Sequence, residues 1–80
     1  MPDFNSFAIR NDLRYRPGEC YGNDIRNLEA NLGACNWHCT QQAGCKAFLW
    51  NETYQCFLKY ASCATTDTSN PEDHMFDVKQ

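Results

Sequence analysis

The sequence has few branched aliphatic side chains for its length. Its 80 residues include five Leu, two Ile and one Val, which is eight against eleven aromatic residues. Because a chain this short exposes much surface for its volume, so small an aliphatic core needs a covalent or metal cross-link. The length also excludes a multidomain enzyme, and we expect residues 1–80 to form one module.

Two further absences narrow the class of protein. No run of 18 apolar residues occurs, so no transmembrane helix and no membrane insertion is expected. The net charge of −3 argues against a general nucleic-acid binder. Met1-Pro2-Asp3 begins no export signal, although six cysteines are typical of a secreted or extracellular chain. We therefore expect a module excised from a larger multidomain extracellular protein.

Catalytic motifs are also lacking. The sequence contains no nucleophile elbow, P-loop, HExxH or calcium-loop pattern, so no enzymatic activity and no cofactor is expected. His38 and His74 are lone histidines, with no carboxylate or cysteine placed as a catalytic partner.

The six cysteines are the strongest feature that is present. They allow 15 pairings, and their spacings include no Cys-x2-Cys, while His38 adjoins Cys39 instead of standing at a ligand offset. A zinc site and a redox-active thiol are therefore disfavoured against a structural disulfide set, and no metal site is expected. The cysteines are Cys20, Cys35, Cys39, Cys45, Cys56 and Cys63.

Local patterns around the cysteines predict one helix and one β-hairpin. Asn31 can cap a helix over residues 32–42 that ends at Gly44, and this places Cys35 and Cys39 on one helix face. Strand-like runs over residues 45–50 and 55–60 flank a four-residue loop. Pairing Trp50 with Gln55 then puts Leu49 opposite Cys56, Phe48 opposite Phe57, Ala47 opposite Leu58, and Lys46 opposite Lys59.

This register predicts the disulfides. One hairpin face carries Cys45, Ala47, Leu49, Cys56 and Leu58, and we expect it to meet the helix because it holds both cysteines. Cys45 directly follows the helix and reaches only Cys39, so Cys56 pairs with Cys35. Cys20 and Cys63 then remain, and we expect them to pair with each other. Each bridge is expected to stabilise the fold by about 2–4 kcal/mol, and loss of 35–56 should be the most damaging.

The same residues resemble the PAN/apple domain. The resemblance rests on Cys35-x3-Cys39, Cys45-Lys46-Ala47-Phe48 and Cys56-Phe57-Leu58-Lys59, with Tyr21-Gly22-Asn23-Asp24-Ile25 similar to a family turn. It implies an α+β module in which about five antiparallel strands cradle one helix. Apple modules join cysteines near their two ends, whereas Cys20 and Cys63 lie well inside this chain. Members are non-catalytic extracellular adhesion modules that bind proteins, heparin or galactosides, so the resemblance implies a class of function and no single ligand.

Two surfaces are candidate ligand sites. The hairpin face away from the helix would carry Lys46, Phe48, Trp50, Phe57 and Lys59, a cationic and aromatic surface suited to an anionic sugar. Alternatively, residues 4–9 or 75–78 cover these rings as core. The second surface is an edge with Arg10, Arg14, Tyr15, Arg16 and Tyr21, where arginines interleave with tyrosines; these could equally be ordinary surface residues. The acidic tail offers a weak internal attraction for the arginines.

The sequence thus predicts a non-catalytic module that binds a carbohydrate or a cell-surface glycoprotein. The alternative is a protein–protein module that docks a neighbouring domain or dimerises without binding glycans. Asn51-Glu52-Thr53 is an N-glycosylation sequon on the expected hairpin tip, where a glycan would be tolerated.

Overall fold

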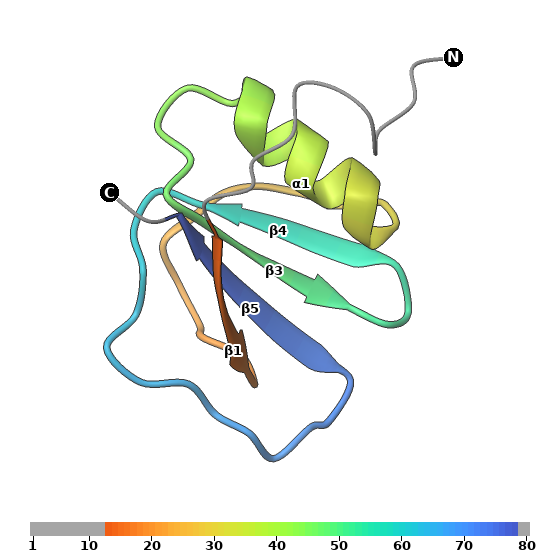
Figure 1. Ribbon diagram of the computed structural model, residues 1–80, viewed down its shortest axis with the longest axis vertical. Coiled ribbons are helices and arrows are strands. Elements are labelled where there is room, and N and C mark those ends of the chain that lie inside the picture. The colour runs from red at the N-terminus through yellow and green to blue at the C-terminus, as the bar shows by residue number, and fades with distance from the viewer. Residues whose placement is uncertain (1–12, 79–80) are drawn as a thin grey trace.

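The computed structural model describes residues 13–78, which form a five-stranded antiparallel sheet with one helix across it (Figure 1). The strands are β1 (Leu13–Pro17), β2 (Asp24–Glu29), β3 (Ala47–Asn51), β4 (Gln55–Lys59) and β5 (Asp73–Val78). Their order in the sheet is β1-β5-β3-β4-β2, and every neighbouring pair is antiparallel. The predicted α+β architecture is confirmed.

The helix α1 (Leu32–Gln41) begins after Asn31 as predicted and ends one residue earlier than predicted, with Gln42 as its C-cap. The Asn31 side chain accepts a hydrogen bond from the Ala34 N–H at 2.8 Å, which satisfies one of the free N–H groups of the first turn. After the helix, Gly44 takes a positive φ of 82°, and the chain turns back to place Cys45 beneath α1. The residues of α1 buried against the sheet are Ala34, Cys35 and Cys39.

The three predicted disulfides are all present. Cys35–Cys56 and Cys39–Cys45 join α1 to the β3–β4 hairpin, with Cα–Cα distances of 5.6 and 5.4 Å. Cys20–Cys63 joins the β1–β2 loop to the segment after β4, at 6.2 Å. Cys35, Cys39 and Cys56 are fully buried, so these sulfurs supply core volume that the few aliphatic residues do not.

The predicted hairpin register is wrong by one residue. Asn51 stays in β3 opposite Gln55, so Trp50 lies opposite Cys56 and Phe48 opposite Leu58. The loop has three residues instead of four because the Asn51 side chain accepts hydrogen bonds from the backbone N–H and the hydroxyl of Thr53. Tyr54 closes the turn at a φ of 68°.

This one-residue shift turns β3 over relative to the prediction, because neighbouring side chains of a strand face opposite ways. Phe48 and Trp50 therefore face α1, and Ala47 and Leu49 face away. Cys45 does not share the face of Ala47 because it lies before β3 begins, where alternation does not apply. The disulfide prediction survives because Cys56 of β4 still faces the helix.

The sheet consequently has two unlike faces. The helix face, covered by α1, has a core of Cys35, Cys39, Cys45, Phe48, Cys56 and Leu58. The opposite face, called here the distal face, has a smaller core of Cys20, Ala47, Leu49 and Met75. The distal face also carries the three buried charged side chains of the described residues: Lys59, Asp73 and Asp77.

The Cys20–Cys63 bridge and the β1–β2 loop lie against the distal face. Glu19 and Asp67 exchange two backbone hydrogen bonds of 2.8 and 2.7 Å, and the Gly18 N–H donates to the Asp73 carbonyl at 2.9 Å. A Cβ on Gly18 would stand 2.6 Å from the Asp67 carbonyl oxygen, and its φ is 101°. Only glycine fits this position, which holds the loop close enough to the sheet to shape a cleft.

Candidate functional site: a cleft on the distal face

The five residues predicted to form one cationic and aromatic surface are split between the two faces. Phe48 is fully buried under α1, and the Trp50 indole, also on the helix face, donates to the Ala30 carbonyl at 2.9 Å. Phe57 and Lys59 lie on the distal face, and Lys46 is exposed just before β3. The predicted surface is therefore not assembled, because it depended on the wrong register. The suggestion that residues 4–9 cover it falls outside the described residues.

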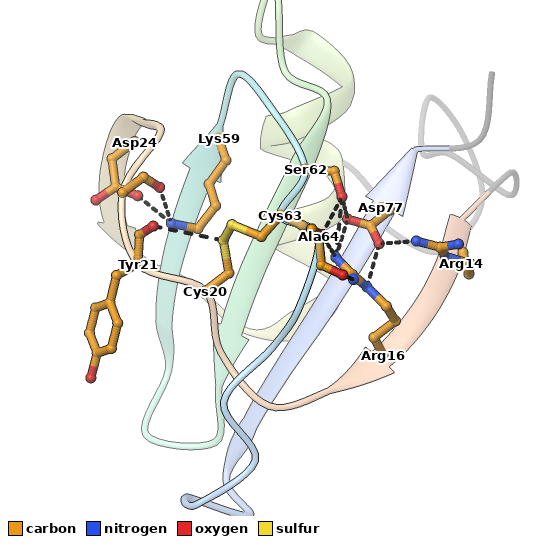
Figure 2. Close-up of a disulfide and its surroundings, with 11 residues drawn as sticks. Arg14, Arg16, Cys20, Tyr21, Asp24, Lys59, Ser62, Cys63, Ala64 and Asp77 are labelled. Carbon is orange, nitrogen blue, oxygen red and sulfur yellow. Dashed lines mark hydrogen bonds and ion pairs between the residues drawn. A yellow bond between two sulfur atoms is a disulfide. The ribbon is translucent and has the colours of Figure 1, made fainter.

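Lys59 does not present its ammonium group to solvent. Its side chain is 2% exposed and donates to Asp24 Oδ1 at 2.6 Å and to the Gly22 carbonyl at 2.8 Å (Figure 2). These two partners fix the β2 entry turn on the end of β4. Lys59 is thus a buried structural cation in this structure and not an exposed anion-binding group.

The second predicted surface is also only partly assembled. Arg14 and Arg16 both bind Asp77 of β5, at 3.2 and 2.7 Å, and Asp77 accepts a third hydrogen bond from Ser62 (Figure 2). The expected attraction between the arginines and the acidic tail is therefore real. Tyr15 lies on the helix face instead, against Phe76. Arg10 falls outside the described residues.

His74 has a carboxylate partner that the sequence did not suggest. Its Nε2 lies 2.7 Å from Glu52 Oε2 in the hairpin loop, and its Nδ1 lies 2.7 Å from the Tyr15 hydroxyl. The ring stacks on Trp50 at 5.9 Å. These contacts tie β1, β5 and the hairpin loop together along the helix face.

The distal face carries a cleft of about 240 Å³, which is the strongest candidate site. It lies between the β1–β2 loop and the β3–β4 strands, where the Cys20–Cys63 bridge holds the loop over the sheet. The volume is below the range of about 300–1,000 Å³ of drug-sized sites and suits one sugar ring or one side chain. Its lining residues are Glu19, Cys20, Tyr21, Asp24, Leu49, Asn51, Gln55, Phe57, Lys59, Asn70 and Asp73.

The cleft combines an apolar floor with polar walls. Leu49, 7% exposed, and the half-buried Phe57 come from adjacent strands at the floor. Tyr21 stands at the rim with 81% of its surface exposed, and its ring projects from the loop (Figure 2). An exposed ring beside amide and carboxylate side chains can contact the apolar and the hydroxyl parts of a ligand together.

Two carboxylates meet at one end of the cleft. Asp73 is 4% exposed, its Oδ1 accepts from the Asn51 amide, and its Oδ2 accepts no hydrogen bond from an amide, ammonium or hydroxyl group of the described residues. The hydrogen bond with Asp73 raises the pKa of Glu19 above its usual value, and the Tyr21 hydroxyl acts in the opposite direction. In turn, the bond to Glu19 raises the pKa of Tyr21. Glu19 therefore interacts with both Asp73 and Tyr21 at this end of the cleft.

A larger groove of about 430 Å³ lies on the helix side but offers fewer polar groups. Leu13, Tyr15, Leu32, Phe48 and Phe76 line most of it. Because ligand sites combine apolar surface with convergent polar groups and perturbed pKa values, the distal cleft is the better candidate.

Three residues of the predicted surfaces line the cleft: Phe57, Lys59 and Tyr21. Its lining residues Glu19, Asn70 and Asp73 were not predicted as site residues. Asp73 ends a polar stretch over residues 64–73 that is typical of an exposed loop, but it begins β5 and is buried. The alternation of Asp73, Met75 and Asp77 could have indicated one face of a strand. Nothing local in the sequence indicates that Glu19 reaches Asp73.

The sequon asparagine lines this cleft instead of standing on the hairpin tip. Asn51 ends β3, and its amide nitrogen donates to buried Asp73. Glycosylation there remains a prediction, but a glycan on that nitrogen would enter the cleft and disturb the bond to Asp73.

The described residues include no group of three or more His, Cys, Asp or Glu side chains able to hold a metal ion. Within residues 13–78, no helix has the length and apolar character to cross a membrane.

Comparison with known families adds one finding. A family model described as "PAN domain" matches residues 13–79, nearly the whole chain. No curated protein and no solved structure matches the chain significantly.

Proposed function

Because the chain belongs to the PAN domain family of protein- and carbohydrate-binding modules, we propose that it is an extracellular adhesion module that binds a carbohydrate in the distal cleft. PAN domains are generally non-catalytic, and we extend this to the present chain. The carbohydrate is carried by a free glycan or by a cell-surface glycoprotein. The module is one of several in a larger secreted chain, as the disulfides favour.

The observation that carries the proposal is the composition of the cleft. Sugar rings present apolar C–H faces and a rim of hydroxyls, so they suit sites with an aromatic ring and planar amide or carboxylate groups. Tyr21 and Phe57 supply rings, and Asn51, Asn70 and Glu19 supply polar groups within a hollow of one-ring size. The hydrogen bond from Asn51 to buried Asp73 holds that wall of the cleft in place before a ligand arrives.

A glycan array tests the proposal with a matched pair of tyrosine variants. Tyr21→Ala removes the rim ring, and Tyr60→Ala removes a ring that is 57% exposed and does not line the cleft. We expect binding of at least one glycan, a loss of about tenfold in affinity with Tyr21→Ala, and an unchanged affinity with Tyr60→Ala.

Lys46→Ala is a second control. Lys46 belonged to the predicted cationic and aromatic surface, which the observed register does not bring together, and it does not line the cleft. Its removal should therefore leave the glycan affinity unchanged. Glycan binding that is equal in all three variants would exclude the cleft. Binding to no glycan would instead favour the alternative of a protein–protein module that docks a neighbouring domain or dimerises.

A further inference from the structure

The cleft has an excess of negative charge. Three carboxylates line it, from Glu19, Asp24 and Asp73, and Lys59 is its one cation among the described residues. Lys59 is 2% exposed and bound to Asp24, so this pair is largely neutralised internally. The uncompensated charge therefore lies at the other end, on Glu19 and Asp73.

Asp73 is also short of a hydrogen-bond donor. It is 4% exposed, its Oδ1 accepts from Asn51, and its Oδ2 accepts no hydrogen bond from an amide, ammonium or hydroxyl group of the described residues, so that only the Glu19 carboxyl, when protonated, can donate to Asp73 there. A buried carboxylate oxygen without a donor is costly, so a ligand group that donates a hydrogen bond there gains affinity. A cationic N–H donor suits it best, because charge-assisted bonds are the stronger ones.

We propose that the distal cleft selects a saccharide that bears a free ammonium group, which lies between the Glu19 and Asp73 carboxylates while the sugar ring packs on Phe57 and Tyr21. This inference rests on the carbohydrate-binding function proposed above and names its ligand class. Saccharides with carboxylate or sulfate groups are rejected, because the Glu19 and Asp73 charges repel them and the buried Lys59 offers no compensation.

The pKa of the Glu19 carboxyl also supports placing the ammonium group between Glu19 and Asp73. The pKa of Glu19 is raised, first by its hydrogen bond with Asp73, so Glu19 binds a proton more readily beside Asp73 than it does in water. An ammonium group would take the place of that proton. Affinity for the aminosaccharide should therefore fall as the pH decreases through the pKa of Glu19.

The width of the cleft favours a saccharide over a lysine side chain from a protein. The floor spans two strands, with Leu49 from β3 and Phe57 from β4. The side-chain amides of Gln55 and Asn70 lie on its walls, where ring hydroxyls can reach them. A slender methylene chain would leave these groups unused.

The experiment is an NMR titration of the chain with three monosaccharides that share the glucopyranose ring: glucosamine, N-acetylglucosamine and glucuronic acid. We expect glucosamine to bind about tenfold more tightly than N-acetylglucosamine at neutral pH, with glucuronic acid the weakest. Nα-acetyl-lysine amide is a fourth probe, and it should bind more weakly than glucosamine.

Glu19→Gln and Glu29→Gln form the matched variant pair. Both remove one carboxylate, but the exposed Glu29 does not line the cleft. Glu19→Gln should reduce the preference for glucosamine to less than about twofold while N-acetylglucosamine still binds, and Glu29→Gln should retain the preference. Raising the ionic strength from about 0.05 to 0.5 M should weaken the same preference in the unaltered protein, which needs no variant to fold.

The outcomes separate the two proposals. Binding of N-acetylglucosamine or glucuronic acid as tightly as glucosamine would overturn the ammonium preference and leave carbohydrate binding intact. Tighter binding of Nα-acetyl-lysine amide would overturn the saccharide assignment in favour of a protein side chain. Binding of no saccharide, here and on the array, would overturn the proposed function itself.

Discussion

The helix face and the distal face of the sheet differ in the side chains that they bury. The helix face is apolar and cross-linked: Phe48, Leu58 and the Cys35–Cys56 bridge are all fully buried beneath α1. The distal face buries charged side chains beside its smaller apolar core, because Lys59 and Asp77 lie there with charged partners. A small domain that concentrates its hydrophobic burial on one face can use the other for a polar cleft.

The disulfides should reveal this difference most strongly. By chain entropy alone, Cys20–Cys63 should stabilise the fold more than Cys35–Cys56 does. Its ring spans 43 residues and that of Cys35–Cys56 spans 21, a difference worth about 0.6 kcal/mol. Packing reverses the order, since Cys35 and Cys56 are fully buried in the main core. Replacing both by Ala should cost about 5 kcal/mol, whereas the Cys20→Ala, Cys63→Ala pair should cost about 3–4 kcal/mol.

Denaturant unfolding followed by near-UV circular dichroism measures both double variants. Equal losses, or a larger loss for the Cys20 and Cys63 pair, would contradict the view that the helix face dominates stability.

Two phenylalanines give the next largest contrast. Phe48 on the helix face is fully buried, while Phe57 on the distal face is half-buried at the cleft floor. Phe48→Ala should lower the free energy of unfolding by about 3–5 kcal/mol, and Phe57→Ala by about 1–2 kcal/mol because less area is buried. If urea unfolding gives similar values for the two, the faces do not differ as described.

The buried charge on the distal face should have a smaller but measurable effect. Asp77 is 5% exposed and binds Arg14, Arg16 and Ser62. Asp77→Asn should cost about 1–3 kcal/mol, because it leaves the largely buried Arg16 without its charge partner. Arg14→Ala removes a side chain that is 59% exposed and should cost less than about 0.5 kcal/mol, measured by thermal unfolding.

The smallest effect is a pH dependence from the helix. Burial, and secondarily Arg26, lowers the pKa of His38 below its usual value of 6.5. The folded state therefore binds this proton less readily than the unfolded state. The contribution of His38 to stability is complete above pH 6.5 and is lost as the pH falls below it. The unaltered protein should therefore lose more stability between pH 7 and pH 5 than the His38→Gln variant does. An identical pH dependence of the two proteins would refute this prediction.

Local patterns in the sequence were sufficient for the helix and the disulfides. Asn31, Gly44 and the Cys35-x3-Cys39 spacing each act within a few residues, so their consequences could be deduced one by one. The face of β3 could not be deduced in that way. It depends on whether Asn51 belongs to the strand or the loop, and its side-chain bonds to Thr53 and Asp73 decide this only in the folded chain.

The cleft was less accessible to prediction than the fold. Phe57 and Tyr21 were identified as candidates because aromatic residues are conspicuous in a sequence. The pairing of Glu19 with Asp73 requires β5 to lie between β1 and β3 in the sheet and the β1–β2 loop to cross the distal face. Such long-range placement has no signal in residue type or spacing, and the misassigned register moved Phe48 and Trp50 to the wrong face.

The most direct test of the central claim is to map the ligand onto the backbone. A 15N-labelled sample is titrated with the glycan that binds best on the array, and amide chemical shifts are followed for residues 13–78. The account predicts changes concentrated at residues 19–24 and 70–73, at Asn51 and at Phe57. Changes concentrated instead on α1 and β1, with the cleft residues unaffected, would contradict it.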